Sequence, residues 1–115
     1  MGKEVVTLLE ILEQRNSYLL EFHKINVNEM DRLNEGCIDN FENFYYSREI
    51  LLNAIDRIDN KLSRYNDVQA NPEEKKKLVE ILRMKRDMTS SILDQDLVIM
   101  SLVEELKNKH PSIAS

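Results

Sequence analysis

The side chains that could bind a metal ion or act as nucleophiles are few and far apart in this sequence. His23 and His110 are the two histidines and Cys37 is the one cysteine. No two of them stand at the short spacing by which metal-binding motifs gather their ligands. Nucleophilic catalysis would need Cys37 or a serine beside a histidine in a preformed pocket, but Cys37 follows a glycine in an expected turn between helices. We therefore expect no metal site and no catalytic residue.

Acidic side chains are plentiful, but their pattern is typical of solvated helix faces. Asp56 and Asp59, for example, lie one turn apart on an expected helix, and nothing in the sequence indicates a pocket that would shift their pKa values. Gly2 and Gly36 are the two glycines, which excludes a glycine-rich phosphate-binding loop. The sequence predicts a protein that is not an enzyme and that binds no cofactor.

Charge and hydropathy narrow the class of partner. Lys and Arg number 16 against 21 Asp and Glu, a formal net charge of −5, which disfavours nucleic acid and anionic membranes as partners. The longest apolar run, residues 97–100, is far shorter than the roughly 20 residues that span a bilayer. The first residues lack the apolar region of a signal peptide, and a single cysteine cannot form an internal disulfide. We expect a cytoplasmic protein, without membrane insertion, whose partner is another protein.

Three long amphipathic helices are expected to carry these residues. The chain has two Gly, two Pro and no Trp in 115 residues, so the signals of sheets and of turn-rich folds are missing. Apolar residues recur at intervals of three and four over about 3–35, 39–66 and 72–109. The sequence predicts a single all-α domain over 1–115, an elongated antiparallel helical bundle or coiled-coil hairpin, with a frayed C-terminus over 110–115.

The expected helix boundaries coincide with cap signals. Gly36 fits the left-handed position just after a helix C-terminus, and Asp39 with Glu42 fits a capping box for the second helix. Asn71 followed by Pro72 and two glutamates fits the start of the third helix.

Two features interrupt the helical pattern. Residues 89–91, Thr-Ser-Ser, form helices poorly, so a third helix that is broken there is an alternative to a continuous one. Polar residues also stand in line with the apolar stripes, where such residues fix register at a cost in stability. They are Asn16, Asn26, Arg48, Lys85 and Gln95.

The end of the third helix is apolar over more than half of its circumference. Its two neighbouring stripes are Ile92, Ile99, Val103 and Leu106, and Leu93, Leu97 and Met100. Such width fits a helix that contacts two neighbours in a bundle, and it equally fits a groove or a releasable helix that accepts a client's amphipathic helix. The candidate partner-binding residues are Ile92, Leu93, Leu97, Met100, Val103 and Leu106.

One stretch, Met30 to Asp59, carries a family resemblance. A helix ends at Arg32-Leu33-Asn34-Glu35-Gly36, and the next carries Asp39, Phe41, Phe44 and Arg48-Glu49-Ile50-Leu51-Leu52. With the opening Leu8-Leu9-Glu10-Ile11-Leu12-Glu13, this arrangement resembles the FlgN and FliT kind of flagellar type III export chaperone.

The resemblance implies a cytosolic bacterial chaperone. Such a protein holds the C-terminal segment of a flagellar cap or hook-associated subunit until export. It would use its own C-terminal helical region, here Ile92 to Leu106, for the client and the export apparatus. The aromatic segment 41–46 departs from the family pattern, which leaves subfamily and client open.

Two functions from different classes are therefore expected. The first is an export chaperone or adaptor that binds an amphipathic C-terminal helical segment of its client and prevents premature assembly. The alternative is a structural coiled-coil protein whose stripes mediate self-association, for example as a homodimer.

Overall fold

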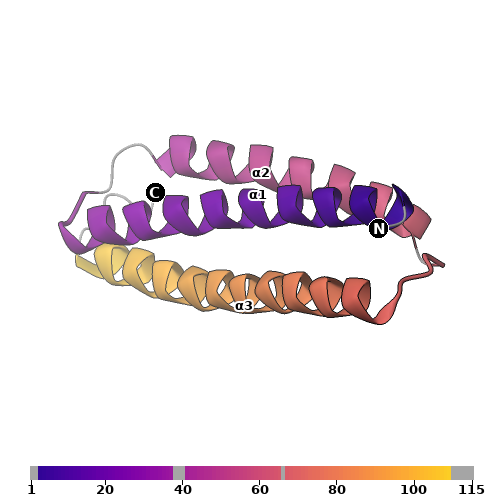
Figure 1. Cartoon of the computed structure of the whole chain (residues 1–115). Helices are drawn as coiled ribbons and strands as arrows, with labels where there is room; N and C mark the ends of the chain where they lie inside the picture. Colours follow the sequence, from indigo (N-terminus) through magenta and orange to yellow (C-terminus); the bar gives the residue numbers. More distant parts are fainter. Residues whose placement is uncertain (1–2, 38–40, 66, 110–115) are drawn as a thin grey trace.

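The chain folds into three long helices (Figure 1). The structure is a computed structural model that describes residues 3–37, 41–65 and 67–109. Helix α1 spans Lys3–Asn34, α2 spans Phe41–Leu62 and α3 spans Pro72–Lys109, with a short 3-10 helix, η1, at Ser63–Tyr65. The described residues contain no strand, and the prediction of an all-α bundle is confirmed.

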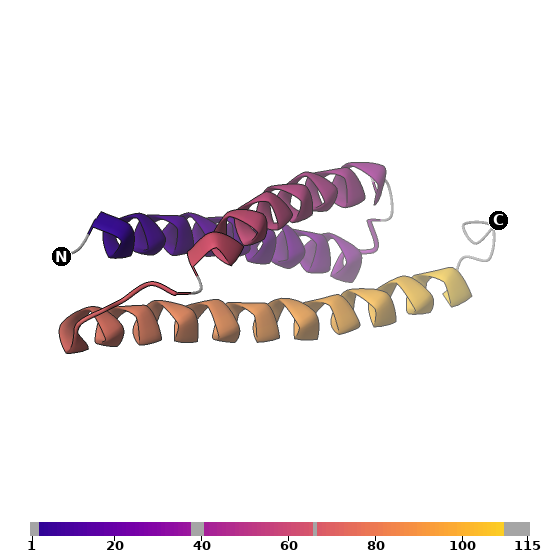
Figure 2. The same cartoon turned by 90° about the vertical axis from the view of Figure 1, so that its right-hand side faces the viewer.

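Helix α1 is the middle helix of the bundle. It packs against both α2 and α3, with α2 antiparallel and α3 parallel to it (Figure 1). Figure 2 shows that α2 is inclined to the other two helices. The molecule measures 59 × 21 × 17 Å along its principal axes, so the expected elongated shape is also confirmed.

Two apolar clusters hold the helices together, and each takes a buried residue from all three helices. The first cluster consists of Leu19, Phe22, Ile55 and Ile92, with Tyr18, Leu51 and Met88 against it. The second consists of Leu33, Phe44 and Ile99, with Ile25, Met30, Phe41, Leu102, Val103 and Leu106 against it. The three-and-four spacing of these residues places them on one face of each helix.

The observed helix ends follow the expected ranges closely except at the end of α2. Helix α1 ends one residue before its expected end and α3 matches its expected range, whereas α2 gives way to η1 after Leu62. In η1, the Ser63 hydroxyl donates a hydrogen bond to the Asn60 carbonyl (2.7 Å), and such local bonds favour a tighter turn over continued α-helix. The expected start at Asp39 and the frayed end over 110–115 lie outside the described residues.

The end of α1 and the start of α3 are capped as expected. Gly36 has φ of 81°; its N–H donates to the Leu33 carbonyl (3.0 Å) and the next N–H, of Cys37, donates to the Arg32 carbonyl (2.9 Å). These two bonds form a Schellman motif. At the start of α3, the backbone N–H of Asn71 donates to Glu74 Oε1 (3.0 Å), and the Glu74 N–H donates to Asn71 Oδ1 (2.8 Å), which is a capping box.

Helix α3 is continuous through residues 89–91, so the alternative of a broken third helix is wrong. The Thr89 hydroxyl donates to the Lys85 carbonyl (2.7 Å) within the helix, while Ser90 and Ser91 are exposed. Met88 and Ile92 on either side pack into the first cluster. Tertiary packing therefore outweighs the weak helix propensity of this segment.

Candidate protein-binding surfaces

The six candidate partner-binding residues divide into an inward and an outward group. Ile92 is buried in the first apolar cluster, and Val103 and Leu106 pack against the second. These three residues hold α3 in the bundle, so binding a partner through them would require α3 to separate from α1 and α2.

The outward group forms an exposed apolar surface on α3. Leu93, Leu97 and Met100 are 61%, 66% and 65% exposed. Their spacing of four and three residues places them on one face within two turns. We call these three residues the outer stripe.

The outer stripe continues toward the N-terminal end of α3. Val79 and Leu82 are both exposed. With a rotation of 100° per residue, they and the outer stripe fall within one arc of about 60° on the surface of α3. Arg86 lies between the two parts, and Thr89, Ser90, Arg86 and Lys85 line a shallow depression with Leu82 and Leu93. The part of this face around Leu82 is therefore flanked by basic side chains, and the part toward Met100 is more apolar.

A second apolar surface is a groove between the N-terminal halves of α1 and α3, of about 850 Å³. Val6, Leu9 and Leu20 line it from α1, and Ile81, Met84 and Met88 line it from α3. The sequence pattern assigned none of these positions to a binding surface, because a groove needs two helices and its register is a tertiary property.

A polar layer crosses the bundle between the two apolar clusters. Asn26, which has no exposed surface, donates through Nδ2 to Gln95 Oε1 (3.3 Å) and to Asp96 Oδ1 (3.3 Å). Gln95 Nε2 lies 2.7 Å from His23 Nδ1. Asn26 and Gln95 are buried in this layer, and Asn16 is buried elsewhere in α1. All three are polar residues that the sequence placed in the apolar stripes.

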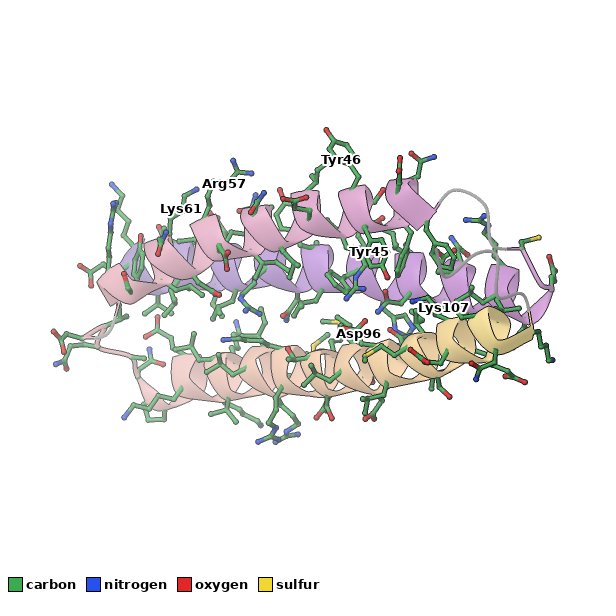
Figure 3. The ribbon with its side chains drawn as sticks, turned by 180° about the vertical axis from the view of Figure 1, so that it is seen from behind. Tyr45, Tyr46, Arg57, Lys61, Asp96 and Lys107 are labelled. Carbon is green, nitrogen blue, oxygen red and sulfur yellow. The ribbon has the colours of Figure 1, made fainter. Side chains whose placement is uncertain are left out.

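Arg48 joins α2 to this layer. Its Nη2 lies 2.9 Å from both carboxylate oxygens of Asp96, and its guanidinium lies 4.9 Å from the Phe22 ring centroid and 5.1 Å from that of Phe44. In Figure 3, Asp96 points from α3 toward the other two helices, whereas Tyr46, Arg57 and Lys61 point away from the bundle. Cation–π and charge-assisted contacts make Arg48 a specific link between helices, although the spacing alone marked it only as a misfit.

The polar layer has the composition of a structural network. Its one imidazole, His23, contacts an amide and not a hydroxyl or thiol.

No group of three or more His, Cys, Asp or Glu that could hold a metal ion occurs among the described residues, and Cys37 is exposed beside the Schellman turn. None of the described helices is long and apolar enough to cross a membrane.

Glu29 is a buried carboxyl on α1, with 3% of its surface exposed. Arg32 Nη1 donates to its Oε1 (3.1 Å), and its Oε2 has no hydrogen-bond partner among the described residues. Burial raises the pKa of the Glu29 carboxyl, and the Arg32 guanidinium opposes that shift.

The aromatic segment at the start of α2 serves both the core and the surface. Phe44 is buried in the second cluster and Phe41 packs against it, whereas Tyr45 and Tyr46 are exposed. The Tyr45 ring contacts the rings of Phe41 and Phe44, with centroids 6.4 and 5.4 Å apart. Phe41 and Phe44 therefore anchor the start of α2 in the core, while Tyr45 and Tyr46 face solvent.

Comparisons of the chain with protein-family models, with curated proteins and with solved structures found no match. Function must therefore be argued from the two exposed apolar surfaces.

Proposed function

We propose that this protein is a binding module of the export-chaperone kind, which holds an amphipathic helix of a client protein against the outer stripe of α3. The observation that carries the proposal is the exposure of Leu93, Leu97 and Met100 on a helix whose opposite face is fixed in the core. When one helix binds in a groove or along another helix, side chains at such i, i+4 and i+7 positions are the anchors.

The energetics favour a transient complex. Covering the exposed part of a Leu or Met side chain contributes roughly 1 to 2 kcal/mol, so the three anchors together contribute a few kcal/mol before the cost of association. Because the cost of association is of similar size, these anchors by themselves give weak, reversible binding, as holding a subunit before its export requires.

The resemblance of Met30 to Asp59 to FlgN- and FliT-type chaperones supports the choice of client. On that basis the client is the C-terminal segment of a flagellar cap or hook-associated subunit, with the export apparatus as a second partner, and the setting is the bacterial cytoplasm.

The test is a titration of fluorescent C-terminal peptides of flagellar cap and hook-associated subunits with the intact protein. We expect one such peptide to bind, and the variant Leu93→Asp/Leu97→Asp/Met100→Asp to bind about 100-fold or more weakly, since each anchor lost costs on the order of 1 kcal/mol. The control variant Tyr46→Asp/Ile50→Asp changes exposed apolar residues of α2 and should bind like the intact protein. Circular dichroism checks that both variants fold.

The second candidate function is self-association, which the seven-residue interval between Leu93 and Met100 favours because it is the repeat of a coiled-coil seam. Sedimentation equilibrium separates the two. A dimer that the triple Asp variant abolishes, together with no binding of any flagellar peptide, would replace the chaperone by a structural coiled coil.

A further inference from the structure

The groove between α1 and α3 is a separate surface from the outer stripe. Met84, in the groove, and Leu93, in the stripe, are nine residues apart in α3, which places them about 180° apart around the helix. A ligand in the groove therefore leaves the outer stripe free, and this inference does not depend on the proposed function.

The groove has the dimensions of a helix-binding site. Its α1 wall runs from Val6 to Leu20, which at 1.5 Å per residue is about 21 Å, or about four helical turns. Leu20 and Met84 are 45% and 53% exposed, so the walls already present apolar surface to solvent. Methionines such as Met84 and Met88 adapt their shape to an incoming side chain.

The rim of the groove is acidic. Glu10 and Glu13 stand on the α1 side and Glu80 on the α3 side, against the single cation Lys77 among the lining residues that the structure describes. On its outer side Glu80 also borders a depression with Lys76 and Arg83, which do not line the groove, so the acidic character of the rim rests on Glu10, Glu13 and Glu80. The rim charge is complementary to a basic partner and repels an acidic one.

The floor of the groove offers a hydrogen-bond acceptor. Asn16 lines the groove and is 8% exposed; its Nδ2 donates to the Ile81 carbonyl (3.2 Å). Its Oδ1 is buried without a hydrogen-bond partner among the described residues. Such an orphaned acceptor is costly, and a donor side chain entering the groove would satisfy it.

We propose that this groove binds an amphipathic helix of a partner protein, about four turns long, whose apolar face is flanked by Lys and Arg residues. The apolar face covers the Leu and Met side chains of the walls, and the basic flanks pair with Glu10, Glu13 and Glu80. One donor-bearing side chain reaches Asn16.

The experiment uses two synthetic helical peptides of about 15 residues. Both carry Leu at alternating intervals of three and four residues. The basic peptide has Lys and Arg beside this apolar face, and the acidic peptide has Glu there. Fluorescence anisotropy measures their binding to the full chain. We expect the basic peptide to bind about tenfold or more tightly than the acidic one. In Glu13→Lys/Glu80→Lys this preference should reverse, and Leu20→Asp/Met84→Asp should abolish binding of both.

The matched control is Glu49→Lys/Asp56→Lys, which makes the same change of net charge on exposed positions of α2 and should leave the peptide preference in place. The proposal is overturned if this control reverses the preference as strongly as the groove variant does. Loss of binding in Leu93→Asp/Leu97→Asp with none in Leu20→Asp/Met84→Asp would equally overturn it. A concentration-dependent mass that the groove variants abolish would assign the groove to a second copy of the chain instead.

Discussion

Asn26 is a fully buried polar residue at the centre of the bundle, where an apolar residue would pack without a desolvation cost. Its amide contacts two residues of α3, Gln95 and Asp96, and Asp96 in turn holds Arg48 of α2. Because these bonds form in one register of the three helices, the residue specifies how the helices align.

Replacing Asn26 tests this role. We expect Asn26→Ala to lower the free energy of unfolding by about 1 to 3 kcal/mol, because Gln95 and Asp96 lose a buried donor. Asn28→Ala, at an exposed position of the same helix, should change it by less than about 0.5 kcal/mol. Urea unfolding followed by circular dichroism measures both, and equal effects would contradict a structural role for the polar layer.

Glu29 makes stability depend on pH. Burial raises the pKa of the Glu29 carboxyl in the folded state. Between the pKa of the unfolded chain and that of the folded chain, the carboxyl is therefore protonated when folded and ionised when unfolded. The contribution of Glu29 to stability therefore falls as pH rises through that window.

Glu29→Gln removes this ionisation. The free energy of unfolding of the variant, minus that of the original chain, should be greater at about pH 7 than at about pH 4, as measured by urea unfolding at both. Glu21→Gln, an exposed carboxyl on the same helix, controls for the loss of one negative charge. A difference that shrinks with rising pH would show that the Arg32 contact outweighs burial.

At the scale of the helices, the turn after α1 depends on one residue. Gly36 has φ of +81°, and a Cβ atom built there meets nothing within 4 Å. Any cost of substitution must therefore come from the backbone conformation and not from a clash.

We expect Gly36→Ala to destabilise the fold by about 1 kcal/mol. Gly36→Asn should cost less, since asparagine tolerates the left-handed conformation. Thermal unfolding of the two variants compares them, and a cost for Asn as great as that for Ala would show that the Schellman motif does not govern the turn.

Local signals made the helices predictable, whereas the surfaces depend on packing between helices. The Asn71 and Gly36 caps act within a few residues, so their patterns could be read directly from the chain. The two stripes at the end of α3 were visible as apolar residues, but which stripe faces the core depends on where α1 and α2 lie. Sequence periodicity could not separate Ile92, which is buried, from Leu93, which is exposed.

The groove illustrates the same limit more strongly. Leu20 and Met84 are 64 positions apart in the chain, and each is unremarkable on its own helix. Only the alignment of α1 with α3 brings them together in the groove with its acidic rim. Asn16 was recognised as a polar residue in the seam, but its unpaired Oδ1 at the groove floor requires the neighbouring Ile81 backbone to be known.

At the scale of the whole molecule, the bundle is a rod. Its radius of gyration is 18.2 Å, against about 13 Å for a compact domain of this length. An elongated bundle exposes long helix faces, and this shape leaves room for the two separate apolar surfaces.

Small-angle X-ray scattering of the monomer should give a radius of gyration close to 18.2 Å. A helical peptide bound in the groove lies alongside the rod and should raise this value only slightly, whereas end-to-end association would raise it strongly. A value near 13 Å would show that the helices fold back on one another in solution.

The central position of α1 also has a consequence for synthesis. Because α1 is made first and α3 last, the roughly 75 residues from Asn34 to Lys109 take about 4 to 15 seconds to emerge at the usual rate of translation. During that interval the side of α1 that carries Asn16, His23 and Asn26 has no α3 to cover it. We expect each newly made chain to expose this polar face of α1 to neighbouring molecules until α3 emerges and packs against it.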